Sequence, residues 1–280
     1  MSYRSILANL NEIANKQAML TSASVLAREF DARLTGLYIV PAAPIYPSSS
    51  YEPVPDMFEA HRKYFDHQAE AMKTAFEAAV TGVGIRTELR IEKSPSPLIG
   101  DRLIEEGRSF DMILVSQTEA ASQLGVELDF VPRVAVAGGR PVVVVPFSCP
   151  VGSIPETVVV GWNGSREAAR AVFDSLPFLK RTRKVHVVWV DPSVKRREMD
   201  ALAGEGIARS LELHGVKVVM DLVDGDDHRA GDVLMKRVAD LRAGLLVIGA
   251  YGRPRLSEFI LGGVTRTVLR KMRCPVFLSH

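Results

Sequence analysis

Four glycines near the end of the sequence have the spacing and the neighbours of an anion-binding loop. They follow the pattern Gly-x2-Gly-x9-Gly with one further glycine: Gly249, Gly252, Gly262 and Gly263. The apolar residues 245–248 precede them and are typical of a strand buried on both faces, whereas the apolar positions in 264–272 have helical spacing. A helix N-terminus presents unpaired amide groups and a partial positive charge. With Arg253 in the loop, this order of strand, loop and helix predicts a binding site for a phosphate-sized anion.

The elements that must position this loop repeat along the chain. Segments with strand and helix patterns alternate throughout, which requires parallel strands joined by helical crossovers. Residues 139–145 and 273–279 each contain an arginine, a proline and an apolar run, so the chain repeats at a period of about 140 residues. We therefore predict an α/β fold with two similar, Rossmann-like doubly wound parallel-sheet domains. The predicted parts are a first domain (1–147), a linker (148–156) and a second domain (157–280).

Local patterns predict several details of these domains. Residues 166–179 form one predicted helix, and Ser165 is its predicted N-cap, with Glu167 in the first turn. Residues 41–55 contain five prolines and a serine run, which are typical of a surface loop. Gly249, directly after an apolar strand, marks a place where the backbone approaches a neighbour closely.

The glycine spacing, the strand before it, the helix after it and the closing strand 274–278 together resemble the nucleotide-binding signature of the universal stress protein family. The repeat extends this resemblance over nearly the whole chain, once per half. The resemblance implies a tandem protein that binds an adenine nucleotide (ATP, ADP or AMP) in its second domain, with Mg²⁺ accompanying ATP. It also implies that the closing strands 141–145 and 275–279 pair antiparallel, which makes an intrachain pseudo-dimer, and it leaves a homodimer of chains open.

The resemblance assigns ten residues of the second half to the nucleotide site. Gly161, Asn163 and Val190 would line the base side, and the others would hold phosphate and ribose: Gly249, Gly252, Arg253, Gly262, Gly263, Val264 and Thr265. Two positions depart from the family pattern. Asn163 replaces an aspartate and carries no charge, and Gly263 lacks the hydroxyl of the usual serine or threonine but keeps its amide.

The first half lacks this signature. Residues 116–125 contain no paired glycines, and no arginine occurs between Val115 and Phe130. The acidic side chains of Glu119, Glu127 and Asp129 would repel a polyphosphate at this edge of the sheet. We interpret the first domain as a partner that supports the second, and a different ligand there stays open.

Composition excludes several classes of protein. A net charge of +2 at pH 7 does not indicate nucleic acid or an acidic membrane surface as a partner. Two cysteines, Cys149 and Cys274, are too few for a disulfide framework and match no metal motif. The sequence has no apolar run of about 18 residues that would span a bilayer. We therefore expect a cytoplasmic protein.

Other polar groups have simpler explanations than catalysis. His61 and His67 lie on different faces of one predicted helix, and His186 is expected to be a hydrogen-bonded histidine of the core or rim. The acidic cluster around Asp221 and His228 would suit a metal, but a helix cap and a solvated turn explain it as well. No nucleophile motif or Walker lysine is present, so we expect no catalytic residue and at most slow ATP hydrolysis.

Two functions follow from the sequence. The first is a stress-response protein that acts by binding an adenine nucleotide rather than by fast catalysis. The second is an interaction module whose nucleotide site is vestigial, since one half has lost the signature and the other carries two substitutions. Gly252→Val distinguishes them, because only the first function requires this glycine for ligand binding. A nucleotide-dependent transferase lacks a second substrate site in the sequence.

Overall fold

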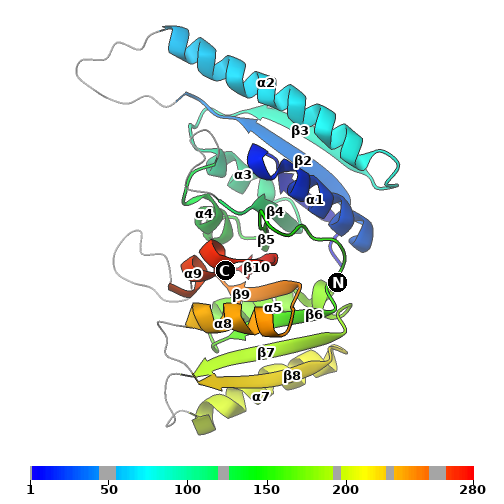
Figure 1. The fold of residues 1–280 in the computed structure, drawn as a ribbon, viewed down its shortest axis with the longest axis vertical. Coiled ribbons are helices and arrows are strands. Elements are labelled where there is room, and N and C mark those ends of the chain that lie inside the picture. Colours follow the sequence, from blue (N-terminus) through cyan, green and yellow to red (C-terminus); the bar gives the residue numbers. More distant parts are fainter. Residues whose placement is uncertain (1, 44–54, 119–125, 192–196, 225–229, 252–262) are drawn as a thin grey trace, which may run out of the picture.

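The computed structural model describes residues 2–43, 55–118, 126–191, 197–224, 230–251 and 263–280. These residues include ten strands that form one sheet, in the order β3-β2-β1-β4-β5-β10-β9-β6-β7-β8 (Figure 1). The strands of the first half are β1 (Ser5–Asn9), β2 (Arg33–Val40), β3 (Thr87–Lys93), β4 (Met112–Ser116) and β5 (Val142–Val145). Those of the second half are β6 (Thr157–Trp162), β7 (Lys184–Asp191), β8 (Val218–Asp224), β9 (Leu245–Gly249) and β10 (Val276–Ser279).

Each half contributes five parallel strands with the same internal order. The third strand of each half lies outermost, followed by the second, first, fourth and fifth, so the order reverses between β1 and β4 and again between β6 and β9. This reversal defines a doubly wound sheet and the point at which such sheets bind ligands. The predicted α/β fold class is confirmed.

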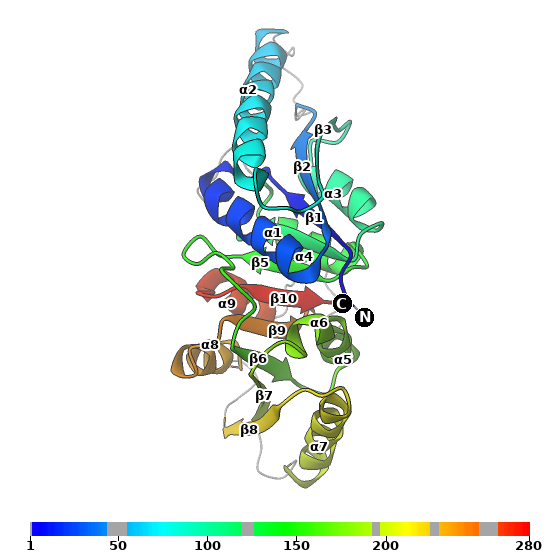
Figure 2. The same ribbon diagram turned by 90° about the vertical axis from the view of Figure 1, so that its right-hand side faces the viewer.

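Helices cover both faces of the sheet (Figure 2). On one face, apolar side chains pack from α1 (Lys16–Phe30), α2 (Pro55–Val80), α5 (Arg166–Asp174), α6 (Leu176–Leu179) and α7 (Arg197–Leu213). The other face carries α3 (Ile99–Gly107), α4 (Phe130–Ala137), α8 (Ala230–Asp240) and α9 (Gly263–Lys271). A short 3-10 helix (Ile13–Asn15) precedes α1. Residues 44–54 of the predicted proline-rich loop lie outside the described residues.

The two halves meet at β5 and β10, which pair antiparallel in the middle of the sheet (Figure 1). Val144 lies opposite Val276, and Val142 lies opposite Leu278. Each strand pairs with β4 or β9 on its other side, so neither leaves an unpaired edge. Closing both edges in this way satisfies their backbone groups and removes two sites for edge-to-edge aggregation.

Aromatic side chains pack across the same junction. The ring centroids of Tyr3 and Phe30 are 4.9 Å apart, and those of Phe30 and Phe178 are 4.8 Å apart, both pairs edge to face. Phe178 in turn contacts Phe277 of β10 at 6.0 Å. The Tyr3 hydroxyl donates a hydrogen bond to the Asp174 carbonyl. The two halves therefore share one continuous apolar core on this face.

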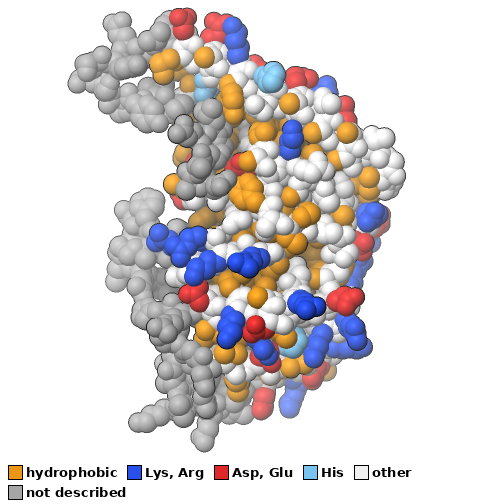
Figure 3. Space-filling view, viewed as in Figure 1, with side chains coloured by type: hydrophobic (Ala, Val, Ile, Leu, Met, Phe, Trp, Pro, Cys, Tyr) orange, Lys and Arg blue, Asp and Glu red, His pale blue; other side chains and the backbone are white. Residues whose placement is uncertain are grey.

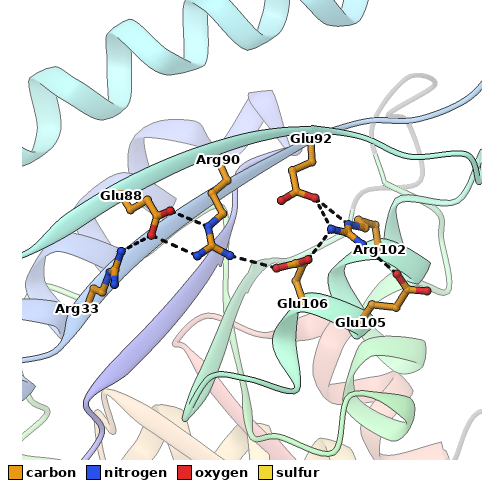
Figure 4. A network of polar contacts seen from close by, with 7 residues as sticks. All are labelled: Arg33, Glu88, Arg90, Glu92, Arg102, Glu105 and Glu106. Atoms are coloured by element: carbon orange, nitrogen blue, oxygen red, sulfur yellow. Dashed lines mark hydrogen bonds and ion pairs between the residues drawn. The ribbon is translucent and has the colours of Figure 1, made fainter.

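The outer edge strand β3 carries a chain of charged side chains (Figure 4). Arg90 Nε lies 2.9 Å from a Glu88 oxygen, and Arg90 Nη1 lies 3.2 Å from Glu106 of α3. Arg102 of α3 extends the chain to Glu92 with an Nε to oxygen distance of 2.8 Å. Charged side chains on an edge strand oppose pairing with another chain.

The single helix predicted over 166–179 is two helices, and this prediction is wrong. α5 ends at Asp174, α6 begins at Leu176, and Ser175 lies between them. Pro177 has no amide hydrogen for an intrahelical bond, and its ring crowds the preceding turn. The Ser175 hydroxyl donates to the Val172 carbonyl at 2.9 Å, which helps to close the break.

Candidate functional site

The candidate site lies at the carboxyl ends of β6, β7 and β9 in the second half. Parallel register places Trp162 beside Trp189 and Gly161 beside Ile248, so the ends of the three strands meet at one edge. Of the ten predicted site residues, seven are described: Gly161, Asn163, Val190, Gly249, Gly263, Val264 and Thr265. Gly252, Arg253 and Gly262 lie outside the described residues.

Gly249 lies against the backbone of α5. A Cβ atom on Gly249 would be 2.5 Å from the Ala168 nitrogen and 2.5 Å from the Glu167 carbonyl carbon. The sequence predicted that the backbone approaches a neighbour closely at this position, and that neighbour is the first turn of α5. Gly161 is similarly constrained, because its Cβ would be 2.9 Å from Ile248 and 3.0 Å from Leu234. Packing alone therefore explains the glycine at 249, where the close atoms are backbone, whereas at Gly161 they are side-chain methyl groups.

The turn between β6 and α5 presents Asn163 to solvent. Asn163 is exposed, and its Oδ1 accepts a hydrogen bond from the Ser165 amide at 3.1 Å. Ser165 Oγ accepts from the Ala168 amide at 3.1 Å, which confirms Ser165 as the N-cap of α5. Gly164 between them has φ +72°, which favours glycine. Because the Asn163 oxygen is engaged, its amide group faces outward as a hydrogen-bond donor.

The N-terminal ends of α8 and α9 lie side by side at this edge. A Cβ on Gly231, in the first turn of α8, would be 2.8 Å from Thr267 and 3.2 Å from the Val264 carbonyl oxygen. Thr265 is buried, whereas Gly263 is exposed, and no atom of the described residues other than its own neighbours lies within 4 Å of its Cβ position. The first turn of α5 contacts the end of β9 at Gly249, but the buried Glu167 carboxylate already lies in that turn, so the dipoles of α8 and α9 are the ones that favour an added anion at this edge.

The second half of the chain also carries more positive charge than the first half. Residues 148–280 contain 21 Lys and Arg against 15 Asp and Glu, whereas residues 1–147 contain 14 against 18. Basic side chains gather over the region of α8 and α9 (Figure 3), where Arg266 and Arg270 of α9 are exposed. A net positive half attracts anionic ligands more strongly than a net negative one.

Tyr251 is a residue of this edge that the sequence analysis missed. It follows β9 with φ +58°, and its buried hydroxyl oxygen has no hydrogen-bond partner among the residues that the structure describes. Burial raises the pKa of this hydroxyl. Trp162 Nε1 is a second buried donor at this edge that has no partner in the described part of the chain. A polar aromatic residue between two glycines of the loop was the available signal for Tyr251.

The corresponding edge of the first half is filled by its own polar side chains. Asn9, Asn11 and Asn15 are all at least 95% buried. Asn11 Nδ2 donates to the Ile39 carbonyl at 2.7 Å, and the Ile39 amide donates back to Asn11 Oδ1 at 3.1 Å. Asn15 Nδ2 donates to Ser116 Oγ at 2.8 Å. These bonds tie the ends of β1 and β2 together where a ligand would enter.

A carboxylate of the first half lies at the N-terminus of α3. Both oxygens of Glu127 are buried, and burial raises the pKa of this carboxyl. Nearby amides, including those of Ile99 and Gly100, and the Arg133 guanidinium lower that pKa in part, although neither oxygen makes an aligned hydrogen bond. The helix end in this half therefore faces a negative group of the same chain.

The acidic residue considered for a metal has protein partners. Asp221 Oδ2 lies 2.9 Å from His186 Nδ1 and accepts from Arg237 Nη2 at 2.8 Å. The predicted hydrogen bonding of His186 is confirmed. Asp226, Asp227 and His228 lie outside the described residues. Within the described ranges, no three His, Cys, Asp or Glu side chains are grouped as a metal site, and no helix is long and apolar enough to cross a membrane.

Comparison with known proteins identifies relatives of this fold and sequence. The model of the universal stress protein family matches residues 155–280. Universal stress protein Slr1230 of Synechocystis sp. is 31% identical over 93 residues, which are 33% of this chain and 31% of that protein. Universal stress protein MJ0577 of Methanocaldococcus jannaschii is 32% identical over 74 residues, which are 26% of this chain and 44% of that protein. The matched stretches thus span less than half of either curated relative.

A solved structure resembles the chain along nearly its whole length. The crystal structure of a universal stress protein from Archaeoglobus fulgidus covers 98% of this chain and 97% of its own, with a TM-score of 0.72 and 14% identity. This likeness shows a shared fold. The family assignment rests on the sequence matches, which identify residues 155–280 as a region of the universal stress protein family.

Proposed function

We propose that the protein binds an adenine nucleotide in a domain formed by residues 157–280, with residues 1–147 as its partner domain. The contrast between the two halves carries this proposal. In the first half, buried asparagines fill the edge where the strand order reverses. In the second half, Asn163 and Gly263 at the same edge are exposed, and the N-terminal ends of α8 and α9 lie together there.

The resemblance of the glycine loop to the family signature supports a nucleotide as the anion. Gly252, Arg253, Gly262, Gly263, Val264 and Thr265 are the proposed contacts to phosphate and ribose, with Mg²⁺ accompanying ATP. Gly161, Asn163 and Val190 are the proposed lining of the base side. We add Tyr251 to this set, because its buried hydroxyl has no partner within the described residues.

The proposed role is ligand-dependent binding in a cytoplasmic stress response rather than rapid hydrolysis. Helix ends and glycine amides position and neutralise phosphates, but fast phosphoryl transfer also requires a group that positions the attacking water. The sequence supplies no Walker lysine. We therefore expect ATP turnover to be slow in comparison with dedicated ATPases.

One observation favours the alternative, an interaction module with a vestigial site. Gly249 is explained by its backbone contacts within the protein, and Gly161 is crowded by side chains. If the remaining glycines have similar explanations, the loop is architectural and a partner protein is the functional ligand. The alternative predicts that no nucleotide binds at any position in the chain.

Mass spectrometry of small molecules released from the purified, denatured protein tests the proposal first. Calorimetric titration with ATP, ADP and AMP then gives the affinity of the wild type and of Gly252→Val. Gly206→Val is the matched control, because Gly206 lies on α7 away from the edge and has no atom within 4 Å of its Cβ position. Binding that Gly252→Val abolishes and Gly206→Val preserves supports the site. If no nucleotide is bound, the protein is better explained as an interaction module with a vestigial site.

A further inference from the structure

A separate pocket lies in the first half, at the carboxyl ends of β2 and β3. Its volume is about 220 Å³, and its walls come from three segments: residues 40–43 after β2, residues 93–94 at the end of β3, and residues 58, 61 and 62 of α2. The N-terminal end of α2 lies beside the end of β2 (Figure 1). The register pairs Val40 with Lys93, so the two strands end side by side.

The pocket wall is held by specific contacts. His61 Nε2 lies 3.0 Å from the Pro41 carbonyl oxygen, and the His61 ring packs on Phe65 with centroids 4.8 Å apart. The Ser94 amide donates to the Val40 carbonyl at 2.9 Å, and the Ala42 amide donates to the Ser96 carbonyl at 3.1 Å. These bonds attach α2 and the β3 end to the segment after β2, so the three described walls are held together.

The lining combines apolar walls with positive charge. Val40, Pro41, Ala42, Ala43 and Phe58 are apolar, and Phe58 is 38% exposed. Arg62 and Lys93 are exposed cations at the same pocket, and no described lining residue is acidic. Phe58, His61 and Arg62 share one face of α2 because they are spaced three and four residues apart. The pocket also lies near the N-terminal end of α2, where the helix dipole is positive.

We propose that this pocket binds a small organic anion, with its apolar body against Phe58 and Val40 and its anionic group on Arg62 and Lys93. The volume is below the range of about 300–1,000 Å³ that holds drug-sized ligands. It corresponds to about seven water molecules at ~30 Å³ each, which suits a single ring or a short chain with one carboxylate. The site is distinct from the nucleotide site, since it lies in the other half of the chain.

A titration of the isotope-labelled protein with benzoate, followed by NMR, tests the proposal. Benzamide is the neutral probe of the same shape. We expect benzoate to shift the amide signals of Ala42, Ala43 and Ser94 saturably, with a dissociation constant at least about tenfold lower than that of benzamide. Lack of any shift at these residues at about 20 mM benzoate would overturn the proposal, as would equal binding of the two probes.

Variants locate the charge requirement. The double variant Arg62→Gln with Lys93→Gln should raise the benzoate dissociation constant at least about tenfold, and Lys93→Gln alone should raise it less. Lys63→Gln is the matched control, because Lys63 neighbours Arg62 but pairs with Glu59 at 2.7 Å and does not line the pocket. Both cations are exposed, so thermal unfolding should be unchanged. Equal affinities of the double variant and Lys63→Gln would refute the assignment.

Discussion

Replacing Gly249 with alanine tests whether this glycine of the loop serves packing rather than ligand binding. The new Cβ would be 2.5 Å from two backbone atoms of α5, whereas ordinary contacts begin near 3.4 Å. The first turn of α5 would therefore have to withdraw by about 1 Å from a closely packed sheet. Overpacking a core costs about 1–3 kcal/mol, and a clash with backbone belongs at the upper end of that range.

The assay is thermal unfolding of the ligand-free protein. A loss of about 3 kcal/mol lowers the midpoint by roughly 6–12 °C for a chain of this size. Gly263→Ala is the matched control within the same motif, because no atom of the described ranges lies within 4 Å of its Cβ position and its φ is not positive. It should leave stability within about 1 kcal/mol of the wild type. Equal midpoints for Gly249→Ala and the wild type would refute the packing argument. Gly249 would then again be proposed as a residue that contacts the ligand.

Burial raises the pKa of Glu127, so the contribution of this carboxyl to stability is greatest below the ordinary glutamate pKa of about 4.3 and is lost as pH rises. The stability of Glu127→Gln minus that of the wild type should therefore be larger at about pH 7 than at about pH 5. Denaturation profiles that stay parallel between the two pH values would contradict this. Ser165→Ala should cost about 1 kcal/mol in denaturant unfolding through loss of the α5 cap, whereas Ser153→Ala in the linker should cost nothing measurable. Asn11→Ala should cost about 3 kcal/mol, and calorimetry should still give one nucleotide per chain; two per chain would show that the first half also binds. Gly263→Ser should bind ATP several-fold more tightly relative to AMP, because a hydroxyl at this exposed first residue of α9 can donate to a phosphate. An unchanged ATP to AMP ratio in calorimetry would count against phosphate contact there.

The sequence predicted the architecture well because alternation and glycine punctuation are local signals. The order of strands and helices, the α/β class and the Ser165 cap all depend on patterns a few residues long. The break at Ser175 was missed because the apolar spacing of 166–179 continues through it, although Pro177 gave a local signal for the break.

The sequence could not show what each residue of the site contacts. It indicated that Gly249 approaches something closely, but the neighbour is a helix that begins more than 80 residues earlier. His186 and Asp221 meet because β7 and β8 are neighbours in register, which no local pattern reveals. The pocket beside α2 was missed for the same reason, since its walls come from three separate segments.

The antiparallel pairing of β5 and β10 within one chain allows the sequences of the two halves to diverge independently. In a symmetric dimer of identical chains, every substitution at such an interface occurs twice, and each strand must complement itself. Here Val142–Val145 need only complement Val276–Ser279, and the linker keeps the two at a high effective concentration. A substitution in one half is therefore never copied into the other. The strand ends of one half can therefore be occupied by internal hydrogen bonds while those of the other half stay accessible, and the shared ten-stranded sheet remains continuous.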